Sequence, residues 1–421
     1  MPEPSAAGPP APRRLRVLIS AYAFGPSDES EASAGWTFAR AAAQRHDVWV
    51  ITRRRFQDGI DAALAADPEL AAHLTVQYVE LSERLLARKR GPLDVYWYYA
   101  LWQRRVGREA IAMHERIGFD VAHHVTFASD WLPVGLAALD GVPKVWGPVG
   151  GSTYLPLRMC RWIGPRSSAG ELVRSIFTRL MRRIFGDGMA RRSAVVAGLN
   201  PDVARRFRYA RRVVAEANAA LLPVPEAAPP AAAATPARTG KRAVFVGRLV
   251  GWKGPRLAVA AIAEPVAHDW TLEFFGAGRD EPHIRRLAEK LGVGDRVIFH
   301  GHRPRTEALA AYAEADAMLF PSMHDSAPWA VAEASAAGCP VVCLDRGGPP
   351  MLAGPNAYAV PADRNVVRNL ADALVRAGQH RGEPYRRWSI DRLPDLLADW
   401  YADAAGTVSG AASADRSRRP A

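Results

Sequence analysis

Cysteine is scarce in this sequence. Three cysteines occur among 421 residues, at Cys160, Cys339 and Cys343. Their number is odd and their spacing matches no metal site. Small disulfide-stabilised secreted domains carry a denser and even set, so the composition favours a reducing compartment. We therefore expect a cytoplasmic protein whose thiols lie in the core.

Long apolar runs are missing as well. No stretch approaches 18 consecutive apolar residues, so no membrane-spanning helix is predicted. The start, MPEPSAAGPPAPRR, has no apolar core segment, and the VLISAYAF run that follows is too short for a signal peptide.

Metal-binding and hydrolase motifs are also absent. The sequence has no C-x-x-C, H-E-x-x-H or paired D-x-D motif, and His300 and His302 have no third ligand nearby. No nucleophile elbow is present either. We expect a reaction that uses neither a metal ion nor a bound cofactor.

Positive charge, by contrast, is abundant and uneven. The formal net charge is +12, and residues 151–220 contain 14 Arg against 4 acidic residues. A second basic group consists of Arg84, Arg88, Lys89 and Arg90. Nucleic acid, anionic lipid and a phosphorylated acceptor all fit such a field. No nucleic-acid partner is expected, because the basic run lacks the interleaved aromatic residues of a stacking platform.

Short apolar runs alternate with helical patterns along both halves, which predicts parallel, doubly wound sheets. We expect α/β architecture with two Rossmann-like domains, 14–223 and 241–389, facing across a cleft. The Pro/Ala-rich segment 224–240 reads as a linker. The remaining expectations are a C-terminal helix, 390–405, that crosses back to the first domain, and disordered tails at 1–13 and 406–421. The predicted strands are 16–21, 48–52, 74–79, 121–125, 144–146, 194–197, 242–246, 271–275, 297–299, 317–320 and 341–344.

The segment 316–350 reads as strand, loop, helix, strand and glycine loop. Ser326 is expected to cap the helix, with Pro328 in its first turn and Gly338 at its end. Asp325 and Glu333 then lie near unpaired backbone N–H groups, which suit a polar, partly anionic ligand.

Two glycine-containing turns follow predicted strands. In FVGRLVGWKGP, Gly247 permits close approach, and Arg248 and Lys253 are placed to converge on a diphosphate, although a solvated surface turn is the simpler alternative. In FGAG, Gly276 and Gly278 mark a turn that is either a ligand contact or only a tight turn. Position 281 is Glu, which argues against a dinucleotide fingerprint.

Taken together, these segments resemble the family 4 retaining glycosyltransferases of GT-B fold (glycosyl transferases group 1). GRLVGWKG is similar to that family's diphosphate-binding motif, and HDSAPWAVAEASAAGCPVV is similar to its E-x7-E segment and following strand. SAYAFGPSDESEASAGW resembles the S-E-P-G-x-G-W loop of one subgroup, and HHVTFASDWLP and WGPVGG resemble the central region of that subgroup. Asp325 stands where the wider family has Glu.

The resemblance implies a role for each matching residue. Arg248 and Lys253 would grip the diphosphate, Glu333 would hold the donor ribose, and Asp325 would hold the sugar hydroxyls. His123 or His124 would face the donor sugar, and His123 is preferred; adjacent strand residues point to opposite faces, so only one can do so. Further donor-site and loop candidates are Gly247, Gly276, Gly278, Ser326, Ala327, Trp329, and, in the first loop, Glu31 and Gly35 at a helix start.

The implied function is retaining transfer of a sugar from a nucleoside diphosphate, UDP or GDP, to an acceptor hydroxyl. The acceptor would be a glycan, a lipid-linked sugar or a small molecule, in synthesis of cell-surface glycan, glycolipid or secondary-metabolite glycosides. A nucleotide-sugar epimerase of the same fold is one alternative, and a basic binder of nucleic acid or membrane is another. Residues 171–186 form an amphipathic, arginine-flanked helix that either contacts anionic lipid on the inner face of the membrane or packs on its own domain.

Overall fold

The computed structural model describes residues 13–27, 30–91, 93–151, 153–222 and 240–416. The expected N-terminal tail and linker lie outside these ranges, apart from one residue of each. The chain forms two compact units. The first contains residues 1–127, 134–145 and 393–421, and the second contains residues 128–133 and 146–392.

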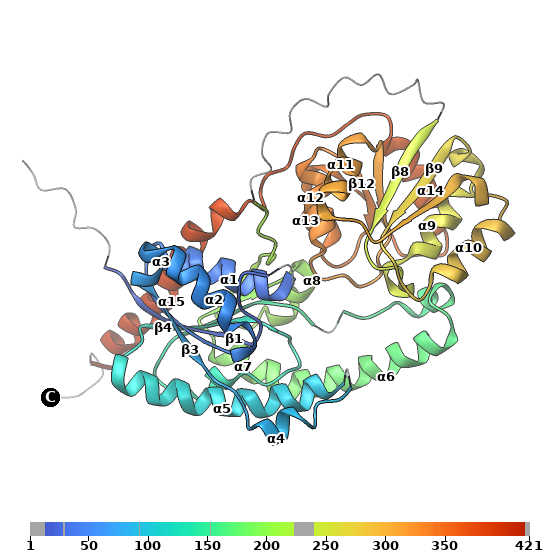
Figure 1. Cartoon of the computed structure of the whole chain (residues 1–421). Helices are drawn as coiled ribbons and strands as arrows, with labels where there is room; N and C mark the ends of the chain where they lie inside the picture. Colours follow the sequence, from blue (N-terminus) through green and yellow to red (C-terminus); the bar gives the residue numbers. More distant parts are fainter. Residues whose placement is uncertain (1–12, 28–29, 92, 152, 223–239, 417–421) are drawn as a thin grey trace, which may run out of the picture. The chain divides into compact units, whose positions relative to one another are not determined.

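Two sheets organise the chain (Figure 1). One has seven strands in the order β3-β2-β1-β4-β5-β6-β7, and the other has six in the order β10-β9-β8-β11-β12-β13. The pairs β1–β2, β1–β4, β8–β9 and β11–β12 are parallel. Each sheet thus reverses its strand order beside its first strand, which is the Rossmann arrangement. The predicted pair of doubly wound α/β domains is confirmed.

Most predicted strands occur within two residues of their expected ends, apart from β5, which runs three residues further. The sequence analysis missed β7 and β13, whose residues are mostly only half-buried. The strands are β1 (Arg16–Ala21), β2 (Asp47–Thr52), β3 (Leu74–Tyr78), β4 (Val121–Thr126), β5 (Lys144–Val149), β6 (Val195–Gly198), β7 (Arg212–Ala215), β8 (Lys241–Val246), β9 (Trp270–Phe275), β10 (Val297–Gly301), β11 (Ala317–Phe320), β12 (Val341–Leu344) and β13 (Ala357–Val360).

Helices connect the strands. Beside the second sheet in Figure 1, α11, α12 and α13 lie on one side, and α9, α10 and α14 lie on the other. The helices are α1 (Ser30–Ala43), α2 (Gln57–Ala66), α3 (Pro68–His73), α4 (Glu83–Leu86), α5 (Asp94–Ile117), α6 (Pro165–Met181), α7 (Asp187–Arg192), α8 (Pro201–Ala204), α9 (Pro255–Ile262), α10 (Glu281–Lys290), α11 (Arg305–Glu314), α12 (Trp329–Ala336), α13 (Pro349–Ala353), α14 (Val366–Ala377) and α15 (Leu393–Arg416).

The first helix begins earlier than expected. It starts at Ser30, so Gly35 lies inside α1 and does not open it. A Cβ at Gly35 would lie 2.7 Å from the carbonyl oxygen of Ala23 and 2.8 Å from Cγ2 of Thr126. The glycine therefore lets α1 approach the ends of β1 and β4 closely, a requirement that local sequence does not reveal.

The two units divide the chain differently from its two sheets. Residues 146–222 group with the second unit by their contacts, whereas β6 and β7 within them belong to the seven-stranded sheet of the predicted first domain. Among the contacts within the second unit, Arg346 donates to the carbonyl oxygen of Tyr154 at 2.8 Å, and Asn200 donates to that of Ser326 at 2.9 Å. The boundary at residue 223 stays a prediction. The last helix, α15, packs on α1 within the first unit and continues to Arg416, beyond the expected end at 405.

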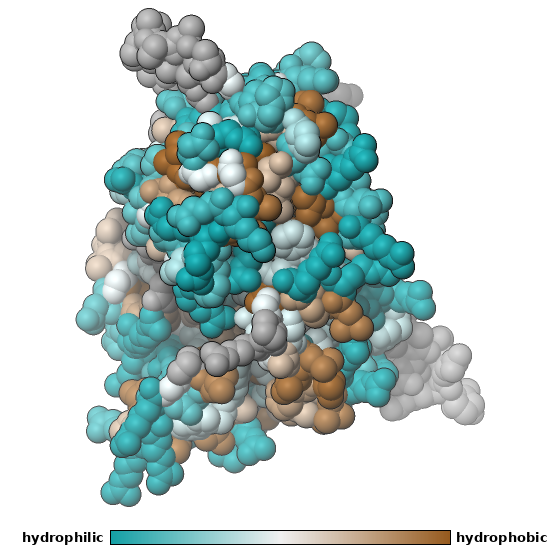
Figure 2. Space-filling model, turned by 90° about the vertical axis from the view of Figure 1, so that its right-hand side faces the viewer, coloured by the Kyte–Doolittle hydropathy of each residue, from teal (hydrophilic) through white to brown (hydrophobic). Residues whose placement is uncertain are grey.

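The cores are apolar, and two of the three cysteines lie in them. Cys339 and Cys343 are fully buried, and burial raises the pKa of each thiol to about 12. Cys160 is half-buried and free. None of the described helices has the length and apolar content needed to cross a membrane. The face shown in Figure 2 is mainly hydrophilic, with a group of hydrophobic side chains in its lower part.

Candidate functional site

The carboxyl ends of two neighbouring strands place the main candidates in the second unit. β8 is followed by Gly247, Arg248 and the 3-10 turn Gly251–Lys253, and β11 is followed by the loop that carries Asp325. In an open α/β sheet, ligands bind beyond these strand ends. The topology therefore explains why residues more than seventy positions apart in the sequence meet.

Lys253 and Asp325 form an ion pair at this edge of the sheet. The Lys253 ammonium donates to Asp325 Oδ2 at 2.7 Å, and Ser322 Oγ donates to the same oxygen at 3.1 Å. The two charged side chains are only 13% and 15% exposed. Rings of Trp252 and Phe320 lie 5.0 and 5.2 Å from the ammonium, so cation–π contacts hold it as well. Asp325 Oδ1 has no hydrogen bond to any described residue.

Arg248 remains exposed. Its guanidinium makes no hydrogen bond or ion pair with the described residues, in contrast to Lys253. Gly247, which precedes it, has φ +148°, and a Cβ there would lie 3.5 Å from Cδ of Lys253. Gly247 therefore lies close to the Lys253 side chain, and Arg248 follows it in the same loop. Convergence of the two cations on one ligand stays a prediction.

Glu333 lies on α12 and has a partner that the sequence analysis missed. Arg305 Nε donates to Glu333 Oε1 at 2.6 Å; the glutamate is 10% exposed and the arginine 52%. Arg305 opens α11, 28 residues away, and no motif connects the two positions. Glu333 Oε2 has no hydrogen bond to a described residue, so one carboxylate oxygen is left for a ligand.

The start of α12 differs in detail from the prediction. Pro328 is the N-cap residue and no side chain caps the helix, so Ser326 does not serve as the cap. Ser326 is held elsewhere: its carbonyl accepts from Asn200, and a Cβ at Gly348 would lie 2.1 Å from that oxygen. Gly338 has φ +68° directly after the helix, which confirms that it ends α12.

The neighbouring residues of this loop are also held from both sides. Trp329 Nε1 donates to Asn218 Oδ1 at 3.4 Å. Gly348 lies against Ala327, whose Cα would be 3.1 Å from an added Cβ, and the Gly348 N–H donates to the Asp325 carbonyl at 2.9 Å. The glycine loop after β12 therefore fixes the loop that carries Asp325.

The FGAG turn packs against the loop after β8, which carries Arg248 and Lys253. A Cβ at Gly276 would lie 2.1 Å from the carbonyl oxygen of Gly247, and one at Gly278 would lie 2.3 Å from that of Leu249. The backbone N–H of Leu249 donates to the carbonyl of Ala277 at 3.0 Å. These glycines permit backbone packing between two strand-end turns, which agrees with the tight-turn interpretation.

The two histidines of β4, in the first unit, are both fully buried. His123 Nδ1 lies 2.8 Å from the Tyr401 hydroxyl, and its ring contacts Trp400. His124 contacts the hydroxyls of Tyr99 and Ser20 at 3.2 and 3.4 Å, and burial, with His123 beside it, lowers its pKa to about 3. They point to opposite faces as predicted, but His123 packs on α15, contrary to the expected donor-facing position.

Glu31 lies in the first turn of α1 and is exposed. Its carboxylate accepts a hydrogen bond from the backbone N–H of Phe127 at 3.2 Å. Phe127 directly follows β4 and has φ +55°, a conformation that is uncommon for a bulky residue. Glu31 thus stabilises the backbone at a strand end, a role that the sequence analysis did not consider.

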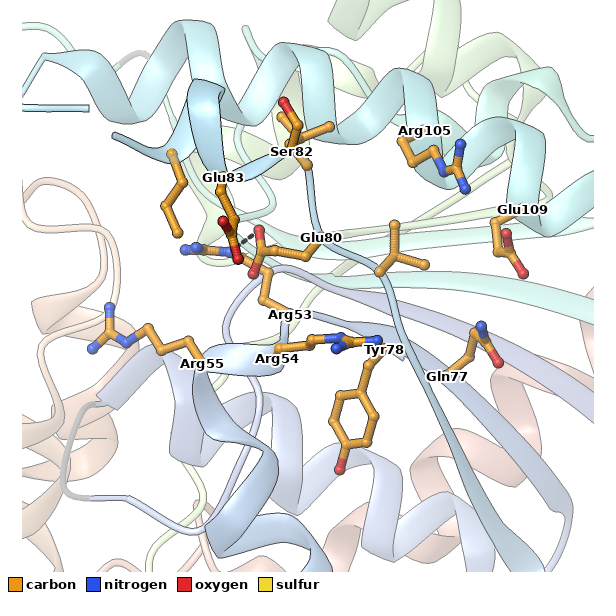
Figure 3. Close-up of a pocket in the computed structure, with 13 residues that line it drawn as sticks. Arg53, Arg54, Arg55, Gln77, Tyr78, Glu80, Ser82, Glu83, Arg105 and Glu109 are labelled. Atoms are coloured by element: carbon orange, nitrogen blue, oxygen red, sulfur yellow. Dashed lines mark hydrogen bonds and ion pairs between the residues drawn. The ribbon is translucent and has the colours of Figure 1, made fainter. Parts of the chain in front are cut away.

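A cavity of about 690 Å³ lies in the first unit, at the carboxyl ends of β2 and β3 (Figure 3). Arg53, 5% exposed, is fixed by Glu80 at 3.4 Å and by the rings of Tyr22 and Tyr98. Arg54 has no hydrogen bond or ion pair with the described residues. Only the run Arg53–Arg55 signals this cavity in the sequence. Its lining comprises Arg53, Arg54, Arg55, Gln77, Tyr78, Val79, Glu80, Leu81, Ser82, Glu83, Leu86, Arg105 and Glu109.

No group of three or more His, Cys, Asp or Glu side chains is placed to hold a metal ion in the part of the chain that the structure describes.

Comparison with known proteins gives this geometry a context. Residues 232–389 match the family model Glycosyl transferases group 1. The chain is 30% identical over 182 residues to D-inositol 3-phosphate glycosyltransferase of Corynebacterium glutamicum (strain R), covering 39% of this chain and 44% of that one. It is 33% identical over 165 residues to 2-deoxystreptamine glucosyltransferase of Streptomyces kanamyceticus, covering 35% and 41%. The chain thus spans less than half the length of the curated relatives it matches.

Similar solved structures cover more of the chain than the curated relatives do. Sucrose-phosphate synthase from Thermosynechococcus elongatus is similar with a TM-score of 0.58 and 17% identity, covering 94% of this chain and 100% of that one. The lipopolysaccharide outer core galactosyltransferase WaaB in its apo form is similar with a TM-score of 0.57 and 13% identity, covering 96% and 100%. The chain therefore has the GT-B fold, and its residues 232–389 match the Glycosyl transferases group 1.

Proposed function

We propose that this chain is a retaining glycosyltransferase that moves a sugar from a nucleoside diphosphate to an acceptor hydroxyl. The observation that carries the proposal is the Lys253–Asp325 ion pair beyond the carboxyl ends of β8 and β11. It lies within the segment that matches the Glycosyl transferases group 1. The same segment contains Arg248 and Glu333, the other two residues with ligand-type chemistry.

Lys253 and Arg248 would bind the diphosphate. The Lys253 ammonium has three N–H donors and gives one to Asp325, so two remain for phosphate oxygens. Arg248 is exposed and supplies a planar fork for a second pair of oxygens. Negative charge grows on the diphosphate as the sugar leaves, so fixed cations stabilise the transition state more than the ground state.

The two carboxylates would hold the neutral parts of the donor. Asp325 uses Oδ2 for its protein partners, and its Oδ1 is left to accept from a sugar hydroxyl. Glu333 uses Oε1 for Arg305, and its Oε2 is left to accept from the ribose hydroxyls. Because each carboxylate is fixed by a cation, it needs little reorganisation when the donor binds.

The transfer balances without any group beyond donor and acceptor. The bond between the anomeric carbon and the diphosphate oxygen breaks, and its electron pair leaves with the diphosphate. The acceptor oxygen forms the new bond on the same face of the sugar, and its proton passes to the departing phosphate or to solvent. Retention follows from bond making and breaking on one face.

The acceptor would be a glycan, a lipid-linked sugar or a small molecule. The cavity of the first unit is the candidate acceptor pocket, because it combines exposed arginines with the polar groups of Gln77 and Ser82 (Figure 3). The setting would be cytoplasmic, in cell-surface glycan, glycolipid or secondary-metabolite glycoside synthesis.

The test is a thermal-shift panel of UDP-, GDP- and dTDP-sugars, followed by a transfer assay whose product is examined by proton NMR. We expect one donor class to raise Tm, because a ligand at a hundred times its Kd stabilises by about 2.7 kcal/mol. The anomeric coupling constants of product and donor should show the same configuration. Absence of any shift across the panel would refute the donor site, and an inverted anomer would refute retention.

A further inference from the structure

Helix α6 carries an exposed apolar stripe. Five of its side chains, and two more in the π-helical turn Arg182–Gly186 that follows it, are large, apolar and between 38% and 68% exposed. They recur at helical spacing along one side of the helix. Such a continuous row is unlike the scattered single exposed residues of an ordinary surface. The row comprises Leu172, Val173, Ile176, Phe177, Leu180, Ile184 and Phe185.

The opposite side of α6 is anchored to its own unit. Arg174 donates to Glu171 at 2.6 Å and to the carbonyl of Thr153 at 2.8 Å, and Thr178 is buried. Ser168 Oγ donates to the carbonyl of Cys160 at 3.0 Å. The helix is therefore held in place by its polar side, and its apolar side is presented outward.

A second element extends the apolar surface. The turn Leu157–Trp162 packs against α6, and its Leu157 is 81% exposed. Leu157 and the seven residues of the α6 row are together called the apolar row below.

The charge around the apolar row is positive. Arg179 and Arg183 are exposed on α6 and its extension, Arg158 and Arg161 are exposed on the turn that packs against α6, and no acidic residue occurs between Leu172 and Gly186. Arg179 and Arg183 lie one turn apart on α6 and its π-helical extension, at the edge of the row. The nearest acid, Glu171, is neutralised by Arg174. An apolar row edged by arginines complements a surface that has an apolar interior beneath an outer layer of negative charge.

We propose that the apolar row and its arginines form a docking surface for anionic lipid bilayers. The row would enter the boundary between headgroups and acyl chains, and Arg158, Arg161, Arg179 and Arg183 would contact the phosphates. A second copy of the chain fits less well, because pairing the rows of two copies brings arginine against arginine. The proposal concerns a surface separate from the nucleotide-sugar residues and does not depend on them.

The experiment is co-sedimentation of the full chain with vesicles of phosphatidylcholine alone or with phosphatidylglycerol added. We expect binding to the anionic vesicles, weakened by salt, and little binding to the neutral ones. Arg158→Glu/Arg183→Glu should lower the partition coefficient at least twenty-five-fold, since each arginine near such a surface is worth roughly a factor of five. The matched control is Arg286→Glu/Arg364→Glu, two exposed arginines with no described partner elsewhere in the unit, which should bind like the wild type.

The apolar contribution needs its own variants. Ile176→Ser/Leu180→Ser removes two exposed side chains one helical turn apart and should abolish vesicle binding without lowering Tm. Leu291→Ser/Ile298→Ser removes two comparably exposed side chains outside the row and should leave binding intact. Equal binding to neutral and anionic vesicles, or wild-type binding by the Ile176/Leu180 variant, would overturn the proposal. So would sedimentation equilibrium showing a dimer that this variant abolishes, with no vesicle binding by the wild type.

Discussion

Replacing Lys253 by alanine tests the centre of the proposed donor site. The substitution removes the ammonium 2.7 Å from Asp325 and leaves a carboxylate that is 15% exposed with only Ser322 as partner. Two losses are expected. One is stabilisation of the departing diphosphate, and the other is the favourable environment of the Asp325 carboxylate.

The catalytic loss should be the larger. Removing one preorganised donor from a developing anion costs about 10²- to 10³-fold in turnover, which is about 2.7–4 kcal/mol. The effect should persist at saturating donor, because the cation acts on charge that appears only in the transition state. Lys253→Arg keeps the charge but replaces a mobile point donor by a wider planar group, so it should recover only part of the rate.

The loss of stability in Lys253→Ala is measured separately, so that a catalytic defect can be distinguished from misfolding. Removing one member of a largely buried pair costs about 3–5 kcal/mol when no water reaches it, and less here because both groups keep some exposure. Asp325→Asn in the Lys253→Ala background should restore part of the lost stability, since no unpaired charge remains, but should not restore turnover. Chemical denaturation measures the first quantity and initial rates measure the second.

A matched control is Lys241→Ala. Lys241 pairs with Asp316 at 3.2 Å, but the two side chains are 43% and 29% exposed. Loss of such a surface pair costs about 0.2–1 kcal/mol and should leave turnover unchanged. Full turnover by Lys253→Ala at saturating donor, with Lys241→Ala equally active, would refute the assignment of Lys253 to the diphosphate.

Three further outcomes follow from single residues. Glu333→Gln should raise the donor KM by about tenfold or more and change kcat little, because a ribose contact is uniform binding; an unchanged KM in initial-rate assays would contradict it. Gly35→Ala should cost about 1–3 kcal/mol in chemical denaturation, since its Cβ meets backbone at 2.7 Å, whereas Gly170→Ala, with open space around it, should not destabilise. The folded-state pKa of His124 is about 3, below its usual 6.5, so its contribution to stability is present above pH 6.5 and is lost as pH falls. The free energy of unfolding from chemical denaturation should therefore fall less between pH 6.5 and 5 for His124→Gln than for the wild type.

Features that depend on a short stretch of sequence, such as strand ends and helix ends, were predicted correctly. β1, β11 and β12 have their expected ends because each is a short apolar run closed by loop residues, and Gly338 ends α12 because a left-handed residue is required there. β7 was missed because its four residues, Arg212–Ala215, form a very short run and are only half-buried, so the apolar signal of a buried strand is weak. Local pattern also placed Lys253 and Asp325 at strand ends, where topology brings them together.

Contacts between distant segments decided the rest. His123 was expected to face the donor, but its partner Tyr401 lies 278 residues away on α15, where no pattern in β4 signals it. Arg305 was missed for the same reason. Gly35 resembled a helix start because glycine often stands at one, whereas its actual requirement is the carbonyl of Ala23. Each error concerns a partner supplied by tertiary structure.

Helix α6 connects the proposed lipid surface with the proposed donor loop. His324, the residue before Asp325, stacks on Trp252 at 4.5 Å, and its Nε2 lies 3.6 Å from Glu171 of α6. Burial alone would raise the pKa of Glu171, but its contacts with His324 and Arg174 outweigh burial and hold that pKa at about 2, so the carboxylate is charged at neutral pH. The polar side of α6 therefore lies against the loop that carries Asp325, while its apolar side is exposed.

Binding at two surfaces of one helix is coupled if each stabilises the same arrangement of that helix, and the coupling is reciprocal. Anionic vesicles should then tighten donor binding by the same factor by which the donor tightens vesicle binding. Glu171→Gln removes the charge that faces His324 without touching the apolar row, so it should reduce both factors equally while vesicle binding without donor stays as in the wild type. Both affinity changes are measured by fluorescence titration. If the vesicles change donor affinity by a different factor than the donor changes vesicle affinity, the two measurements do not report one equilibrium. If neither affinity changes in the wild type, α6 serves the lipid surface alone.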